Sequence, residues 1–128
     1  DPQSPSIHKT VIVDPKAPFV LVDPQQMKQV FLNLCLNAIQ AMPQGGHLKL
    51  SLKYVSDEIQ IVFEDTGIGI SPEDQRKLFI PFYTKREGGS GLGLPICQKI
   101  IRAHHGDIKV ESELRKGTKF IITLPHKS

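Results

Sequence analysis

The placement of glycine constrains this 128-residue chain more than any other feature, because six of its ten glycines fall between residues 67 and 93. Gly67 and Gly69 follow Asp65 at the end of an apolar segment. The second cluster precedes a helical pattern and consists of Gly88, Gly89, Gly91 and Gly93. A glycine-rich loop that leads into a helix presents free backbone N–H groups and the positive end of the helix dipole. Two such clusters, joined by a loop containing Lys85 and Arg86, favour phosphate binding over an ordinary surface loop.

Familiar phosphate motifs do not explain these glycines. Gly88 and Gly93 have the spacing of a P-loop, but Leu94 and Pro95 stand where that motif requires Lys and Ser or Thr. The run from Gly89 to Gly93 lacks the third glycine of the dinucleotide-binding fingerprint, and it follows a loop instead of a strand. The motif set of protein kinases is missing altogether.

A helix over residues 23–42 is the strongest periodic element. Asp23 can cap it, Pro24 suits its first helical position, and Gln26 completes a capping box. Apolar residues follow the helical period, and three more make the helix apolar almost all round. These three are Leu32, Leu36 and Ile39. A helix of this kind should be largely buried.

Alternating apolar and polar residues predict a sheet beside two further helices. The expected strands are 47–55, 58–64, 107–113 and 118–124, paired as two hairpins, with short extended pieces at 10–13 and 19–22. The expected helices are 71–79 and 91–105, the second ended by Gly106, with a flexible loop over 80–91 between them. The predicted fold class is α/β: a two-layer sandwich whose mixed, mostly antiparallel sheet has helices packed on one face.

Composition narrows the class of protein. A chain of 128 residues suits one compact domain, and a net charge of +3 gives no argument for nucleic acid or an anionic membrane as a partner. Cys35 and Cys97 sit in apolar surroundings without a CxxC spacing, which indicates buried thiols in a reducing cytoplasm. No signal peptide or membrane-spanning stretch is present. Because the first residue is Asp1, we expect a piece of a longer protein, and any membrane anchor would lie outside it.

Three amide side chains form a polar stripe on the predicted first helix. Gln29, Asn33 and Asn37 are spaced by four residues and therefore lie on one helix face. A buried amide without a partner costs about 1–3 kcal/mol. A single Asn is more often satisfied by nearby loop backbone, but two on one face beside the glycine clusters indicate the lining of a polar ligand site. An amide oxygen can also serve as one ligand of Mg²⁺ while phosphate oxygens and waters complete the octahedron.

Asp65 ends an apolar strand and precedes a tight turn. Its carboxylate, with Ile68 and Ile70 beside it, can accept a hydrogen bond from an exocyclic amine in an apolar slot, as an adenine site requires. The ordinary alternative is an aspartate that forms a turn with glycine. A rival functional reading is the Asp-Thr-Gly tripeptide of aspartic proteases, but that fold is nearly all β and the two capped helices count against it.

Five segments occur in the order found in the ATP-binding catalytic domain of sensor histidine kinases. They are Asn33-Leu-Cys-Leu-Asn37-Ala38, Asp65-Thr-Gly67-Ile-Gly69, Phe79-Ile-Pro-Phe82, Gly89-Ser90-Gly91-Leu92-Gly93-Leu94 and Gly117-Thr118. These segments resemble the N, G1, F, G2 and G3 boxes of that family, over roughly residues 19–125. The resemblance implies the Bergerat ATP-binding fold, shared with DNA gyrase B, Hsp90 and MutL. The short spacing of the last boxes is similar to the nitrogen-regulator type of sensor kinase.

The resemblance implies roles for single residues. Asp65 would bind the adenine amine, with Thr118 near it, and Asn37 would coordinate Mg²⁺ while Asn33 sits by the phosphates. Residues 80–90 would form a lid over ATP, anchored by Phe79 and Phe82, in which Lys85 makes the main phosphate contact. The catalytic residues would be Asn33, Asn37 and Lys85. The nucleotide-binding set would be Asn33, Asn37, Ala38, Asp65, Gly67, Gly69, Ile70, Phe82, Lys85, Arg86, Gly89, Ser90, Gly91, Leu92, Gly93, Leu94 and Thr118.

One position separates a kinase from an ATPase. In the gyrase, Hsp90 and MutL branch, a Glu four residues before the Mg²⁺-binding Asn activates water, whereas this chain has Asn33 there. An amide cannot take a proton at neutral pH, so the site should hold ATP without fast hydrolysis. Gln40 stands where many histidine kinases have Lys or Arg, which leaves more of the phosphate binding to Lys85 and Arg86.

The resemblance also implies partners outside this chain. None of the five histidines has the context of the family's phosphoacceptor, so the acceptor would lie on a separate dimerisation domain of the parent protein. Residues 1–18 would connect to that domain, residues 19–128 would form the ATP-binding domain, and a response regulator would act downstream. We expect the isolated domain to be a cytoplasmic monomer without direct membrane contact. The alternatives are a nucleotide-binding switch module and an ATPase of the gyrase or Hsp90 branch.

Overall fold

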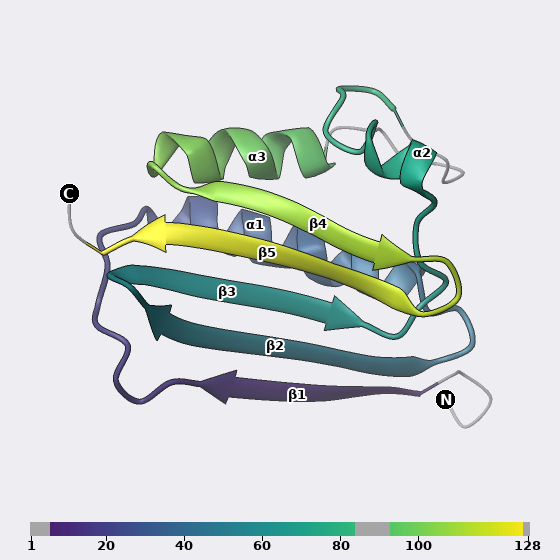
Figure 1. The fold of residues 1–128 in the computed structure, drawn as a ribbon, viewed down its shortest axis with the longest axis horizontal. Helices are drawn as coiled ribbons and strands as arrows, with labels where there is room; N and C mark the ends of the chain where they lie inside the picture. Colours follow the sequence, from purple (N-terminus) through teal and green to yellow (C-terminus); the bar gives the residue numbers. More distant parts are fainter. Residues whose placement is uncertain (1–5, 84–92, 127–128) are drawn as a thin grey trace.

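The computed structural model describes residues 6–83 and 93–126, which form a two-layer sandwich (Figure 1). One layer is a sheet of five strands in the order β1-β2-β3-β5-β4. Their bounds are β1 (Ile7–Val13), β2 (Gly46–Val55), β3 (Glu58–Asp65), β4 (Asp107–Glu113) and β5 (Gly117–Pro125). The helices are α1 (Pro24–Gln40), the short α2 (Pro72–Gln75) and α3 (Gly93–Ala103). Strand β1 pairs parallel to β2 and all other pairs are antiparallel, so the predicted mixed, mostly antiparallel sheet is confirmed.

The core lies between the sheet and the helices α1 and α3. Alternate residues of β3 and β5 point toward the helices, as the period of two along a strand requires. Phe31 of α1 meets Phe63 of β3 edge to face, with ring centroids 5.2 Å apart. The most completely buried side chains are Val30, Leu34, Phe63, Cys97, Ile101 and Ile122. Burial of these side chains fixes the two helices over one face of the sheet.

The outer face of α1 is less buried than its sequence predicts. Leu32 is 54% exposed and Leu36 is 53% exposed, although both continue the apolar pattern of the helix. The expectation that α1 is largely buried is therefore wrong. The core covers only the stripe of α1 that contains Met27, Val30 and Leu34. Among the described residues, no further layer packs on the outer face of the helix.

The N-terminus of α1 is capped partly by a distant residue. The Asp23 side chain accepts hydrogen bonds from the backbone N–H groups of Gln25 and Gln26, as predicted for an N-cap. The backbone N–H of Asp23, however, donates to Nε2 of His104, at 3.0 Å, instead of to the Gln26 side chain of a capping box. His104 thereby links the end of α3 to the start of α1.

The end of α3 differs from its prediction in a similar way. The left-handed conformation falls on His105, with a φ of 65°, and not on Gly106. A Cβ on Gly106 would overlap the carbonyl oxygen of Thr123 in β5. Gly106 is therefore required for close packing of the chain against the sheet.

Three expected elements have different bounds. Residues 19–22 form no strand, and α2 ends at Gln75 instead of reaching Phe79. Residues Ile7–Val13 of the predicted connection form the edge strand β1, so this part of the connection belongs to the sheet. Within the described residues, none of the helices combines the length and the apolar character needed to cross a membrane.

Candidate functional site

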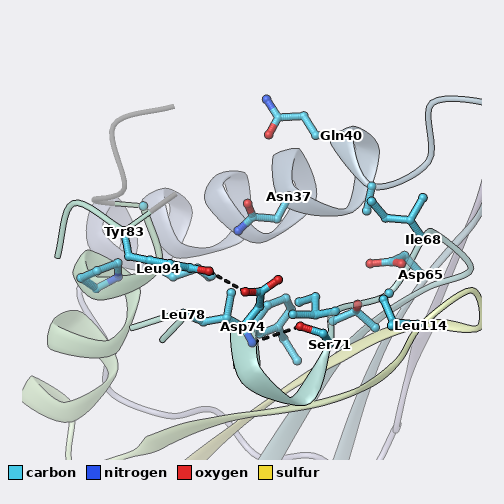
Figure 2. A pocket seen from close by; sticks show the side chains of 17 residues that line it. Asn37, Gln40, Asp65, Ile68, Ser71, Asp74, Leu78, Tyr83, Leu94 and Leu114 are labelled. Atoms are coloured by element: carbon cyan, nitrogen blue, oxygen red, sulfur yellow. Dashed lines mark hydrogen bonds between the residues drawn. The ribbon is translucent and has the colours of Figure 1, made fainter. Parts of the chain in front are cut away.

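A cavity of about 350 Å³ opens where the carboxyl end of β3 meets the helices (Figure 2). Its walls come from α1, the segment after β3, α2, the start of α3 and the β4–β5 turn. The lining residues are Asn37, Gln40, Ala41, Asp65, Ile68, Gly69, Ile70, Ser71, Asp74, Leu78, Tyr83, Gly93, Leu94, Pro95, Leu114, Thr118 and Phe120. Just over half of these residues are aliphatic or aromatic, and the others include the polar side chains of Asn37, Asp65, Asp74 and Thr118. A mainly apolar surface with several polar groups is typical of a small-molecule site.

Asp65 and Thr118 form the buried polar edge of the cavity. They are register partners on β3 and β5, and they are 5% and 4% exposed. Oδ1 of Asp65 accepts a hydrogen bond of 2.9 Å from the backbone N–H of Gly67. Burial raises the pKa of the Asp65 carboxyl and the charge of Glu64 adds to this, whereas backbone N–H bonds from Gly67 and Thr118 oppose it. Asp65 is therefore a desolvated acceptor held at a fixed position.

The raised pKa of Asp65 predicts a pH-dependent effect on stability. The folded protein binds a proton at this carboxyl more readily than the unfolded chain, so the stability that Asp65 contributes is present at low pH and lost as pH rises. The variant Asp65→Asn does not titrate. Its free energy of unfolding relative to wild type should therefore be higher at pH 7 than at about pH 4. Denaturant unfolding at several pH values measures this difference, and a difference that is constant or of opposite slope would contradict the burial argument.

The two glycines after Asp65 are required by packing of the protein against itself. A Cβ on Gly67 would overlap the carbonyl oxygen of Ala41, at the end of α1. Gly69 has a φ of +75°, and its Cβ would overlap the carbonyl oxygen of Glu113. Between them, Ile68 donates to the carbonyl of Ala41, at 2.9 Å. Close contact of this loop with α1 and the β4–β5 turn is therefore sufficient to require both glycines, and the expectation that they also admit a ligand close to the backbone stays a prediction.

The amide side chains of α1 do not share one environment. Asn37 lines the cavity and is directed into it, whereas the Gln40 side chain points away from its centre (Figure 2). Nδ2 of Asn33 donates to the carbonyl oxygen of Gly93, at 3.3 Å, and contacts Sγ of Cys97, at 3.7 Å. Asn33 therefore holds the first turn of α3 and does not line the cavity.

The surroundings of Cys97 follow from the same packing. Burial raises the pKa of the Cys97 thiol to about 11, and the Asn33 amide lowers it only in part. Cys35 is partly exposed, and its pKa is also raised by burial. Neither thiol is activated for nucleophilic chemistry, which agrees with the sequence interpretation of both as packing residues.

One wall of the cavity was missed by sequence reasoning. The Tyr83 hydroxyl donates to Oδ1 of Asp74, at 2.6 Å, and Ser71 caps α2 by accepting from the backbone N–H of Asp74 (Figure 2). The sequence signal for this wall is the Ser71-Pro72 helix start, which predicts α2 but not its contact with Tyr83. Leu114 was also missed, because a turn residue carries no periodic signal.

The structure gathers part of the predicted site and leaves part outside the cavity. The predicted residues that line it are Asn37, Asp65, Gly69, Ile70, Gly93, Leu94 and Thr118. Ala38 packs with Met42 and Leu48 instead, and Gly67 packs closely against the backbone of Ala41. Phe82 is 75% exposed with a φ of 69°, whereas Phe79 packs against the core. The predicted residues Lys85, Arg86, Gly89, Ser90, Gly91 and Leu92 lie outside the described residues.

The sequence of this chain is similar to those of a known protein family and of several curated proteins. The chain matches the family described as histidine kinase-, DNA gyrase B-, and HSP90-like ATPase over residues 22–128. It is 47% identical over 109 residues to sporulation kinase E of Bacillus subtilis (strain 168), an alignment that covers 84% of this chain and 15% of that relative. The chain therefore spans only a small part of the length of the curated relatives it matches.

Solved structures agree with this match. The catalytic domain of histidine kinase ThkA has a TM-score of 0.83 and 34% identity, covering 94% of this chain and 79% of that chain. Full-length ShkA in complex with AMPPNP has a TM-score of 0.84 and 28% identity, covering 93% of this chain and 25% of that chain. The resemblance to the nitrogen-regulator type in particular stays a prediction. The chain belongs to the family of histidine kinase-, DNA gyrase B- and HSP90-like ATPases, as a catalytic domain of the sensor histidine kinase kind.

Proposed function

We propose that the cavity binds Mg²⁺-ATP and that the domain transfers the γ-phosphoryl group to a histidine on a separate domain of its parent protein. The observation that carries this proposal is the buried Asp65 carboxylate, which faces a cavity of about 350 Å³ whose surface is mainly apolar. Family membership and the ATP analogue bound to ShkA support the choice of nucleotide.

The residues of the cavity fit an adenine ring. Ile68, Ile70 and Leu114 supply apolar surface on which a flat heterocycle can be desolvated. Asp65 supplies an acceptor for the exocyclic amine, and its backbone hydrogen bond to Gly67 fixes the direction of that acceptor. A guanine would place its 6-oxo group against the same carboxylate, where two acceptors repel each other. The site therefore favours adenine over guanine.

The donor set also fits Mg²⁺ shared with phosphate groups. Among the described residues there is no cluster of three His, Cys, Asp or Glu side chains that could hold a metal alone. Asn37 directs an amide into the cavity, and its oxygen can supply one ligand while phosphate oxygens and waters supply the others. When bound, the ion would neutralise negative charge on the phosphates.

The variant Asn37→Ala tests this assignment. We expect ADP affinity in Mg²⁺ to fall about tenfold, because one charge-assisted contact is worth ~1.5 kcal/mol or more, while affinity in EDTA should change little. Calorimetric titration of both proteins with and without Mg²⁺ measures the effect. Gln29→Ala, about two turns earlier on the same helix, is the matched control, because Gln29 is exposed and does not line the cavity. Full Mg²⁺ dependence in Asn37→Ala would show that another residue binds the ion.

Transfer is favoured over hydrolysis because, relative to Asn37, this chain lacks the Glu with which the gyrase, Hsp90 and MutL branch activates water. The position four residues earlier is Asn33, whose amide is engaged with Gly93 and Cys97 and cannot accept a proton at neutral pH. None of the five histidines lines the cavity. The phosphoryl group would therefore wait for a nucleophile from another domain, and the chain's part in catalysis would be positioning. We propose that residues 84–92, with Lys85 and Arg86, contribute to the phosphate end of the site.

Phosphoryl transfer can be tested with the chain and its proposed acceptor domain as separate polypeptides. Incubation with γ-labelled ATP and Mg²⁺ should label the acceptor domain in an acid-labile form and leave this chain unlabelled. The chain alone should release phosphate slowly. Fast release without the acceptor would favour the ATPase alternative, and binding without release or transfer would favour the switch module.

A further inference from the structure

Ser112 of β4 lies behind the buried polar edge of the cavity and is not one of its lining residues. Its hydroxyl has three hydrogen-bond partners. Oγ accepts from the backbone N–H of Ile70, at 2.8 Å, donates to the carbonyl oxygen of Gly117, at 2.7 Å, and lies 2.8 Å from Oγ1 of Thr118. Ser112 therefore connects the segment after β3, the β4–β5 turn and the polar edge of the cavity.

The number of hydrogens at this site fixes the direction of each bond. A serine hydroxyl has one hydrogen to donate and two lone pairs that accept. A carbonyl oxygen can only accept, so the Ser112 hydrogen is used on Gly117. The remaining contact must then run from the Thr118 hydroxyl to Oγ of Ser112. With its hydrogen used in this way, Oγ1 of Thr118 can offer only lone pairs to the cavity.

The side chain of Gln75 in α2 fixes the backbone around Ser112. Nε2 of Gln75 donates to the carbonyl oxygens of Ile70, at 2.7 Å, and Ser112, at 2.9 Å. These bonds tie α2 to β4 and fix the backbone on both sides of the Ser112 hydroxyl. The direction of the Thr118 hydroxyl is therefore set by a preorganised network instead of by the ligand.

We propose that Ser112 is a specificity-determining positioning residue, which makes Thr118 a hydrogen-bond acceptor and so gives the cavity an edge of two acceptors, Asp65 and Thr118. Such an edge takes an exocyclic amine, whose two hydrogens can be donated directly or through water, and it rejects a 6-oxo purine. This inference rests on the proposed function and assigns the choice between 6-amino and 6-oxo rings to a residue that contacts neither.

The test compares ADP with inosine diphosphate, which differs at the 6-position of the ring. The variant Ser112→Ala removes the acceptor for the Thr118 hydroxyl, which can then turn and donate to a 6-oxo group. We expect the ratio of ADP to inosine diphosphate affinity to fall about tenfold, the value of roughly one hydrogen bond. Ser112→Thr keeps a hydroxyl and should retain the wild-type ratio. Calorimetric titration of each protein with both nucleotides gives the ratio.

A double-mutant cycle shows whether Ser112 acts through Thr118. In a Thr118→Val background, Ser112→Ala should leave the affinity ratio unchanged within about twofold, because no hydroxyl remains to be oriented. Ser112→Ala also leaves the Ile70 N–H without its partner, which can impair folding. The near-isosteric Ser112→Cys, a weak acceptor, then serves in its place and should lower the ratio in the same direction.

The outcomes separate this inference from the function on which it rests. If the unaltered chain binds no ADP, the proposed function fails and the inference with it. If the chain binds ADP but Ser112→Ala weakens both nucleotides equally, Ser112 has a merely structural role and the inference alone is overturned. The same follows if the change in ratio persists in the Thr118→Val background.

Discussion

Replacing Asp65 with Asn should weaken ADP binding by about 100-fold or more while leaving the fold intact. The Asn carbonyl can still accept from the Gly67 N–H, so the local turn keeps its hydrogen bond. Its amide group, however, presents hydrogens where the adenine amine must donate. Loss of a hydrogen bond to a charged group costs ~1.5–3 kcal/mol, and the mismatch between donors adds to this, so we expect affinity to fall by about 100-fold or more.

Glu64→Gln is the matched control for this variant. It removes the same charge from the preceding residue of β3, whose side chain points to the opposite face of the sheet. ADP affinity should be close to that of wild type in Glu64→Gln. Circular dichroism and thermal unfolding of both variants show that binding was compared between folded proteins. Undiminished affinity in Asp65→Asn would refute the assignment of Asp65 to the adenine amine.

Replacing Gly69 with Ala should cause a large loss of stability. The residue has a φ of +75°, and its Cβ would overlap the carbonyl oxygen of Glu113. A left-handed conformation costs a non-glycine residue ~1–2 kcal/mol, and overpacking against backbone costs a further ~1–3 kcal/mol. We expect the free energy of unfolding to fall by about 2–5 kcal/mol, with a lower midpoint in thermal and denaturant unfolding.

Gly93→Ala is the control, because Gly93 also lines the cavity but has room for a side chain among the described residues. Of these residues, the nearest atom to an added Cβ is Cγ of Asn33, at 3.9 Å, which is an ordinary contact. Gly93 begins α3, where Ala is the better helix former, so stability should be unchanged or slightly raised. Equal stability of the two variants would mean that the β4–β5 turn can move away from residue 69 at little cost.

The elements of the fold could be predicted where they rest on local periodicity. Helix α1 and the hairpins β2–β3 and β4–β5 follow from apolar spacing and from turn residues. The parallel pairing of β1 with β2 could not be predicted, because it joins segments more than 30 residues apart with no connecting signal. The capping of Asp23 by His104 is non-local in the same way, and it displaced the local capping box.

In the candidate site, too, the residues that could be predicted are those with a local sequence signal, and the others depend on distant contacts. Asp65 and Asn37 could be predicted as cavity residues because a carboxylate before a glycine turn and two amides on one helix face occur in a chain with two glycine clusters. Asn33 could not be distinguished from Asn37 by spacing, since the outcome depends on where α3 begins. The glycines could be found but not explained, because their contacts are with Ala41 and Glu113 across the fold.

The most direct test of the central claim is calorimetric titration of the chain with ADP and with GDP in the presence of Mg²⁺. We expect one site for ADP with a dissociation constant near the micromolar range, about −8 kcal/mol, and affinity for GDP weaker by about 100-fold or more. Equal affinity for the two nucleotides would contradict the assignment of Asp65 to the exocyclic amine. No binding of either nucleotide would contradict the claim that this cavity is an adenine nucleotide site.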